Sequence, residues 1–600
     1  MRLALIDWII IAAFLLLSLC IGVLASRRAG KNASEFFLSG RSMPWWLIGF
    51  SMVATTFSTD TPNLVTNFVR NDGVAGNWQW WAFLLTGMMT VFVFAKLWRR
   101  SGLMTDVAFY ELRYSGKPAA FLRGFRAVYM AFIFGIIQQA AVTLAAIKIF
   151  GILIGMKPWQ VILIGGGVTA VYSMVGGLRG VVWTDFFQFS VAMTGSIAAA
   201  VVAVNHPQIG SLGNLLAHEN VRPLLSMVPD FADTNLLVGV FVMPLAVYWW
   251  AVWYPGSEPG GGAYVAQRIL SAKNERHAMG ATLFFQFAHY ALRPWPWIIV
   301  ALCSVIVFPD IASMQRQFPH IAADRVQNDL AYPAMLTFLP AGLMGLVTAS
   351  LIAAYMSTLS TQLNLMSSYT VNDFYVRFVD PGASERRKVL VGRLMTLVLL
   401  CLSSLVALSL ESAERAFTLI ISIGAGTGLV FLLRWFWWRI SAYSEIAGMS
   451  ASLLTAMYFQ FVHERLGLPS LQSWQQLLCT IAVTTIVWVV VTLLTPPTSE
   501  ERLRQFYRAV RPGGPGWRRV RQRAQAEGEQ MPSLHWDVPL GILCMLIGCM
   551  AVYGALFAIG NWIYGNTLHA VVLTLIALAA AAGILFLWGR LTTEKLEHRA

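Results

Sequence analysis

Runs of about 20 apolar residues recur along this chain from near its first residue almost to its last. A helix needs about that length to cross the hydrocarbon core of a bilayer. Hydrophobic residues make up 57% of the 600 residues and charged residues only 12%, about half the charged fraction of a soluble chain. The pattern predicts an all-α, polytopic membrane protein of about 15 transmembrane helices. We place them at 3–24, 43–70, 77–98, 124–155, 158–176, 180–204, 234–254, 281–309, 335–370, 388–411, 414–440, 444–464, 475–496, 538–561 and 566–589.

The net charge of +14 comes from basic residues in short segments between apolar runs. Such clustering is typical of the cytoplasmic side of a multi-pass protein and argues against nucleic acid as a partner. It predicts a protein of the cell membrane with its N-terminus outside and its C-terminus cytoplasmic. The inside loops are then 25–42, 99–123, 255–280, 371–393 and 497–537.

Two sets of five helices, 43–204 and 234–440, have opposite orientations in this layout. Inverted repeats of this kind are a common plan of secondary transporters, although helix count alone does not establish one. Residues 1–42 then form an extra N-terminal helix and loop. Residues 441–600 form accessory helices, and their Arg-rich loop 497–537 is expected to lie on anionic lipid.

The helix at 43–70 is polar at mid-membrane depth, in the stretch Ala54-Thr-Thr-Phe-Ser-Thr-Asp-Thr-Pro-Asn63. Pro62 cannot donate a backbone hydrogen bond, and Asp60 can cap a new helix start. We therefore expect an unwound break with a second half-helix beginning near Asp60, whose freed carbonyls line a cavity. The alternative is a kinked but continuous helix.

A row of hydroxyls follows one face of the helix at 335–370. Ala354, Ser357, Thr358 and Thr361 share that face by their spacing, and Ser360 lies alongside. Several oxygen ligands suit a dehydrated hard cation. Close packing of small residues between helices explains the same pattern equally well.

Asp185 lies about one turn inside the helix at 180–204. The carboxylate can compensate the dipole at a helix N-terminus. It can also supply the negative charge of a cation site.

Several motifs together resemble the sodium:solute symporter family, which includes sodium-glucose and sodium-proline carriers. The run from Gly176-Gly177 to Thr184-Asp185 with Gln188 resembles the signature of that family. Phe36–Ser42 looks like the loop before its first core helix, and Ala353–Ser360 with Asn364 looks like its eighth core helix. The likeness covers about residues 1–440. It implies a five-plus-five inverted-repeat core that works by alternating access.

The resemblance also implies sodium ligands, carried over by motif position. One sodium ion is expected at the carbonyls of Ala54, Phe57 and Ala354 and the hydroxyls of Ser357 and Thr358. A second sodium ion, found in some members, is expected at Asp185, Ser357, Ser360 and Thr361. The partners are then sodium ions, a small organic solute and the lipid bilayer; the sequence makes no prediction about oligomeric state.

The solute cavity of the family lies beside the broken helix, so the candidate solute ligands are Thr56, Asp60, Thr61, Gln79 and Trp80. Proline carriers have an aspartate where this chain has Thr56, and sugar carriers have a glutamate near Gln79. A sugar or polyol is the first choice. An amino acid or another amine-bearing solute is the alternative, because Asp60 would favour a cation.

Some features have simpler interpretations. We read Arg293, before Pro294, as a snorkelling charge at a helix entrance, and His289 as isolated. Tyr254–Gly262 reads as a re-entrant or cytoplasmic turn.

The glycines at 424–428 lack the strand that a dinucleotide site requires, so an enzyme is not expected. A transporter-like sensor or channel stays open as another class.

Overall fold

The structure is a computed structural model that describes residues 3–29, 31–254, 256–319, 321, 326–410, 421–422, 424–532 and 536–592. Within these residues the chain is built of helices, and its only β-pairing is two isolated bridges. The helices before residue 210 are α1 (Leu5–Ala29), α2 (Ala33–Leu38), α3 (Trp45–Thr56), α4 (Asp60–Asp72), α5 (Trp78–Trp81), α6 (Leu84–Met89), α7 (Ala95–Ser101), α8 (Phe109–Arg113), α9 (Gly116–Val128), its continuation η4 (Tyr129–Phe134), α10 (Gly135–Ile154), α11 (Pro158–Val161) and α12 (Gly167–Val204).

The remaining helices are α13 (Leu212–Ala217), α14 (Thr234–Leu236), η7 (Leu237–Val242), η8 (Pro244–Tyr248), α15 (Trp249–Ala251), α16 (Ala263–Ser271), α17 (Glu275–Phe287), η9 (Ala288–Leu292), α18 (Pro294–Val307), α19 (Ile311–Gln317), α20 (Ala331–Leu336), α21 (Leu343–Ser368), η12 (Tyr369–Val379), α22 (Glu385–Ser409), α24 (Gly428–Leu433), α25 (Ala442–Phe461), α26 (Ser473–Leu494), α27 (Glu500–Val510), α28 (Arg518–Ala526), α29 (Val538–Ile563) and α30 (Thr567–Thr592).

The predicted all-α, polytopic fold is confirmed. Among the described residues, eleven helices are long and apolar enough to cross a membrane, and they coincide with eleven of the predicted helices. The other four predicted positions fall on the interrupted pair α3–α4, on α11 with the start of α12, on α25, and on 414–440, whose residues 414–420 and 423 lie outside the described part.

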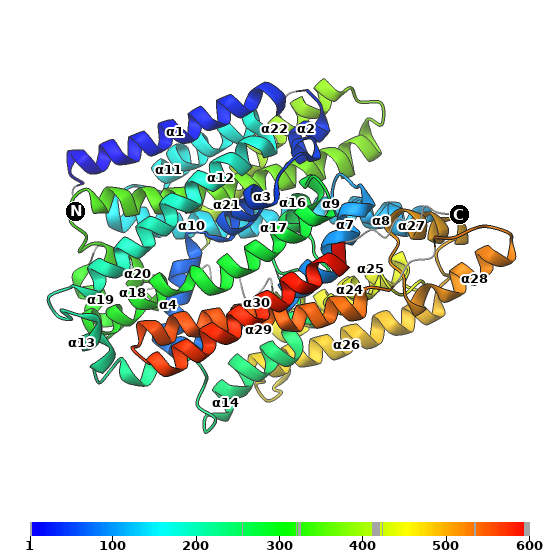
Figure 1. Ribbon diagram of the computed structural model, residues 1–600. Helices are drawn as coiled ribbons and strands as arrows, with labels where there is room; N and C mark the ends of the chain where they lie inside the picture. The colour runs from blue at the N-terminus through cyan, green and yellow to red at the C-terminus, as the bar shows by residue number, and fades with distance from the viewer. Residues whose placement is uncertain are drawn as a thin grey trace.

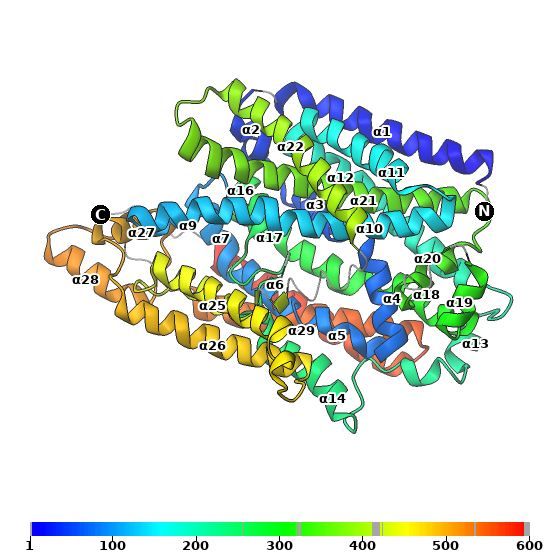
Figure 2. The same cartoon turned by 180° about the vertical axis from the view of Figure 1, so that it is seen from behind.

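The long helices run side by side, and the connecting segments collect at the two ends of the bundle (Figure 1). The basic segments with α2, α8, α27 and α28 lie at one end, whereas α13 and α19 lie at the other, as Figure 2 shows from behind. This separation follows the charge pattern of the loops. At the centre, α12 packs against α21, α1 and α3.

One part of the predicted layout is wrong. Residues 255–280 were expected in an inside loop, yet every described residue from 256 to 272 is buried. The chain leaves α15 at Ala251, and its described residues as far as Gly262 are non-helical and include turns, before a helix begins again as α16. Pro259 and the three glycines that follow it disfavour a helix. Gly261 has φ +73°, and a Cβ there would lie 2.9 Å from Trp98 Nε1. The helical path is therefore interrupted twice, between α3 and α4 and between α15 and α16.

Candidate functional site

The predicted break between α3 and α4 is present. Helix α3 ends at Thr56, and α4 begins at Asp60 after three non-helical residues. The Phe57 amide turns back to donate to the carbonyls of Ala54 and Val53, both at 3.0 Å. Thr59, not Asp60, is the N-cap residue, and its side chain makes no capping bond. The chain is thus interrupted rather than kinked, and a backbone break at this depth exposes carbonyl oxygens to neighbouring groups.

The hydroxyl row of α21 faces this break. Thr358 Oγ1 donates to the Thr55 carbonyl at 2.8 Å and lies 3.2 Å from the carbonyl of Ala354. The five residues expected around the first sodium ion are all buried: Ala54, Phe57, Ala354, Ser357 and Thr358. The fold therefore brings the end of α3 and the middle of α21 into direct contact through oxygen atoms.

Asp185 lies within the long helix α12 and is fully buried. Ser51 Oγ donates to one carboxylate oxygen at 2.5 Å, and Ser357 Oγ donates to the other at 2.6 Å. Because Ser51 belongs to α3 and Ser357 to α21, the carboxylate ties three helices together at one point.

A guanidinium occupies the region expected to hold the second sodium ion. Arg268 of α16 lies 3.6 Å from the Asp185 carboxylate and donates to Thr361 Oγ1 at 2.6 Å. Thr55 Oγ1 lies 3.0 Å from the same Thr361 oxygen, whereas Ser360 Oγ donates to the carbonyl of Ser357. The charge of Asp185 is thus already paired in this conformation, by a residue that sequence reasoning placed in a loop.

A cavity of ≈ 120 Å³ opens beside the break. Thr56, Asp60, Thr61 and Trp80 line it as predicted, whereas Gln79 does not. Its other polar lining residues are Thr55, Ser58, Gln138, Tyr254, Ser257, Tyr264, His289, Tyr290, Arg293, Thr358 and Gln362. Hydroxyl and amide groups from several helices therefore converge on one space.

Arg293 is not the snorkelling charge that was expected. Its side chain is buried, lines the cavity and donates to Thr56 Oγ1 at 2.9 Å. His289, one turn earlier, has its Nδ1 2.9 Å from the same hydroxyl, and Tyr290 stacks on Trp80 with ring centroids 5.6 Å apart. The one sequence signal that Arg293 lines a cavity is its position within an apolar run, since charges inside membrane helices are rare and usually functional.

Interrupted helices that meet at a polar, buried centre define the class of membrane secondary transporters. A profile of the sodium:solute symporter family matches residues 36–452, and the chain belongs to that family. It is a multi-pass membrane protein that couples sodium to the transport of a small organic solute, as the resemblance of its motifs implied.

Individual relatives agree with this assignment. The chain is 27% identical to the sodium/glucose cotransporter of Vibrio parahaemolyticus, over 82% of this chain and 91% of that protein. It is 26% identical to the sodium/myo-inositol cotransporter of Canis lupus familiaris, over 83% of this chain and 74% of that protein. A Na⁺-coupled sialic acid symporter, solved in a substrate-bound outward-open state, shares the fold with a TM-score of 0.65 and 19% identity over 83% of this chain and 99% of that one.

Proposed function

We propose that the transported solute is a sugar or polyol and that it binds in the cavity beside the α3–α4 break. The proposal depends mainly on the residues that line this cavity, which surround it with hydroxyls, amides and aromatic rings. Each ring hydroxyl of such a solute can both donate and accept a hydrogen bond. Tyr264 Oη and Arg293 Nε are buried without hydrogen-bond partners in the described part of the chain, and a bound solute would satisfy them. The named glucose and myo-inositol carriers among the relatives also support this class.

An amine-bearing solute is the second candidate, because Asp60 lines the cavity. Arg293 lines the same space and offsets the negative charge of that carboxylate. A neutral, hydroxylated solute is therefore the better match to the electrostatics.

The proposed sodium site consists of the carbonyls of Ala54, Phe57 and Ala354 with the hydroxyls of Ser357 and Thr358. Sodium there would bridge α3 and α21 and favour the conformation in which they lie close together. Sodium can drive transport only if it binds one conformation of the transport cycle more tightly than the other. Asp185, Ser360 and Thr361 would bind a second sodium ion in a conformation in which Arg268 has moved away from them.

The two repeats would then be 43–204 and 234–440, with 1–42 and 441–600 as additions. The end that carries the basic segments would face the cytoplasm, and the N-terminus would lie outside.

The test is uptake by proteoliposomes that contain the purified protein and are supplied with labelled glucose, myo-inositol, proline or a small amine. We expect uptake of a sugar or polyol in a sodium gradient and its loss when choline replaces sodium. Uptake that is unchanged when choline replaces sodium would contradict sodium coupling. Uptake of proline or the amine alone would contradict the proposed solute class and favour the second candidate.

A further inference from the structure

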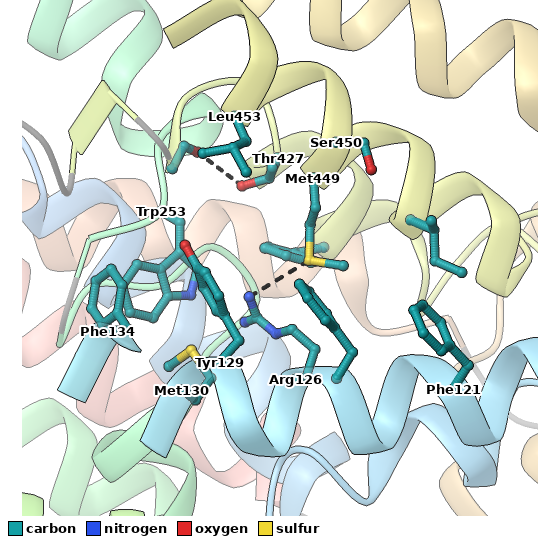
Figure 3. A pocket seen from close by; sticks show the side chains of 14 residues that line it. Phe121, Arg126, Tyr129, Met130, Phe134, Trp253, Thr427, Met449, Ser450 and Leu453 are labelled. Atoms are coloured by element: carbon teal, nitrogen blue, oxygen red, sulfur yellow. Dashed lines mark hydrogen bonds between the residues drawn. The ribbon is translucent and has the colours of Figure 1, made fainter. Parts of the chain in front are cut away.

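A second cavity lies away from the α3–α4 break, between α9–η4 on one side and α24–α25 on the other (Figure 3). Its volume is ≈ 190 Å³. Aromatic and aliphatic side chains form most of its wall, from Phe121 at one end to Phe134 and Trp253 at the other. Neither the family assignment nor the proposed solute site uses this space.

The cavity opens on the outer surface of the helix bundle. Phe121, Phe125 and Leu453 line it, and their exposed fractions are 61%, 42% and 37%. Phe121 and Phe125 belong to the candidate membrane span Gly116–Ile154, so in a bilayer the mouth of the cavity would face lipid.

Arg126 places one positive charge in this apolar wall. Its Nη1 lies 3.7 Å from the sulfur of Met449, a weak acceptor, and its Nε is buried without a partner. The guanidinium lies over the rings of Tyr129 and Phe431, at 5.9 and 5.6 Å from their centroids. Within the described part of the chain no acidic side chain comes within 4 Å of it.

Three buried carboxylates interact with the charge of Arg126: Asp106, Glu258 and Glu445. Glu258 accepts from the Gly256 amide at 3.0 Å, and its other oxygen is buried without a partner among the described residues. Asp106 accepts from the Ala263 amide at 2.9 Å and from Tyr369 Oη at 2.7 Å. Glu445 accepts from Tyr114 Oη at 2.5 Å and pairs with Arg434 at 3.4 Å. These carboxylates offset the charge of Arg126 from a distance, but its buried Nε keeps a donor capacity that the described protein groups leave unused.

We propose that this cavity binds an anionic phospholipid of the surrounding bilayer. The phosphate accepts hydrogen bonds from Arg126, because a guanidinium donates in a fork that matches phosphate oxygens. One acyl chain fills the apolar part of the cavity. The eight residue steps from Arg126 to Phe134 rise by roughly 12 Å along the helix, which is comparable with one leaflet, or half, of a hydrocarbon core about 30 Å thick.

The position of Arg126 along its helix agrees with a headgroup. It lies about one turn from Arg123, in the first part of the candidate span Gly116–Ile154. Arg123 pairs there with Glu111, which lies before that span, at the end of the bundle that carries the basic segments. The phosphate would thus sit near the headgroup level while the chain extends toward Trp253.

The inner end of the cavity touches a functional junction. The Trp253 amide donates to the Gly424 carbonyl at 3.1 Å, and Val252 forms a bridge with Ala425. These residues join the chain after α15 to the segment before α24. An acyl chain seated here contacts the junction directly, so the bound lipid supports the packing of the two segments.

The test is native mass spectrometry of the detergent-purified protein after incubation with phosphatidylglycerol or phosphatidylcholine. We expect one retained phosphatidylglycerol, identified by its mass, and at least a fivefold smaller bound fraction for R126Q. The matched control is R590Q, which removes a guanidinium that lies over Phe586 on the last membrane helix and should leave the bound fraction unchanged. S450W, which fills the cavity without altering charge, should also abolish retention.

Three results would overturn the proposal: no retained lipid on the wild type, equal retention of phosphatidylcholine, or unchanged retention by both R126Q and S450W. Retention of a free fatty acid instead of a phospholipid would show that the ligand is not the proposed anionic phospholipid. Thermal stability and a monodisperse elution profile of each variant show whether a loss of lipid reflects misfolding.

Discussion

The hydroxyl of Thr358 connects the two elements that form the proposed sodium site, because it lies within hydrogen-bond distance of carbonyls on α3 and on its own helix. T358A removes one oxygen ligand from this site. A lost ligand of this kind costs roughly 1–2 kcal/mol, which raises the sodium concentration for half-maximal uptake about tenfold.

The matched control for T358A is T370A, a buried threonine whose hydroxyl donates only to the Met366 carbonyl. Sodium titration of uptake distinguishes the two variants. Equal sodium dependence of T358A, T370A and wild type would rule Thr358 out as a ligand.

Arg268 and Asp185 form an ion pair whose two side chains are fully buried. R268Q leaves the carboxylate without its counter-charge, and breaking a buried pair from one side costs about 3–5 kcal/mol. We expect the melting temperature of R268Q to fall by several degrees and that of the double variant D185N/R268Q to recover part of the loss.

K388Q is the control for this pair, since Lys388 and Glu385 form an ion pair with partly exposed side chains and such pairs contribute at most about 1 kcal/mol. Additive losses in the double variant would mean that Arg268 and Asp185 do not depend on each other.

At the scale of elements, helix α12 shows how a single backbone position sets the path of a membrane helix. Gly177 has φ +53° and ψ −158°, a region open essentially to glycine alone, and a Cβ there would lie 2.7 Å from the carbonyl oxygen of Phe36. The glycine therefore lets α12 bend where α2 packs against it.

We expect G177A to lower the melting temperature of the purified protein by several degrees, because the added methyl group meets backbone that cannot move aside. G167A is the matched control, since it lies in the same helix with no atom within 4 Å of a new Cβ. Alanine there should be neutral or stabilise the helix by up to about 1 kcal/mol. Equal melting temperatures for the two variants would refute the strain argument.

At the scale of the whole molecule, ion pairs connect segments far apart in the sequence, α8 and α9 with η12, at the end that carries the basic segments. Glu111 of α8 pairs with Arg377 of η12 at 2.9 Å and with Arg123 of α9 at 2.7 Å. Arg123 in turn pairs with the buried Asp373 at 2.8 Å. These contacts hold α8, α9 and η12 together.

The pKa of Glu111 predicts how this connection responds to acid. Burial raises that pKa, but hydrogen bonds and charges from Arg377 and Arg123 outweigh burial and bring it below the usual value for glutamate. The stabilisation is therefore complete above a pH of about 4.5 and is lost as the pH falls through the lowered pKa. The difference in stability between wild type and E111Q should be about 1 kcal/mol near neutrality and should shrink only in acid.

Thermal unfolding of both proteins as a function of pH measures this difference. E501Q is the control, because the Glu501 carboxylate accepts a hydrogen bond from Gln505, one turn along the same helix. A wild-type advantage over E111Q that persists unchanged at pH 3 would contradict the assignment.

Local properties of the chain were enough to predict much of this molecule. The length of each apolar run predicted the membrane helices, and Pro62, which lacks an amide proton, predicted the break between α3 and α4. The spacing of Ser357, Thr358 and Thr361 predicted one oxygen-lined face of α21. Each of these features depends on residues within a few turns of one another.

Only the tertiary structure decided which distant groups meet. Arg268 reaches Asp185 across 83 positions of sequence, and Arg293 reaches the Thr56 hydroxyl across 237. The stretch after Ala251 looked like a loop because proline and glycine are common in loops, yet its neighbours bury it. A charge or an unwound backbone survives in a membrane only when partners satisfy it, and those partners come from other helices whose positions no local pattern records.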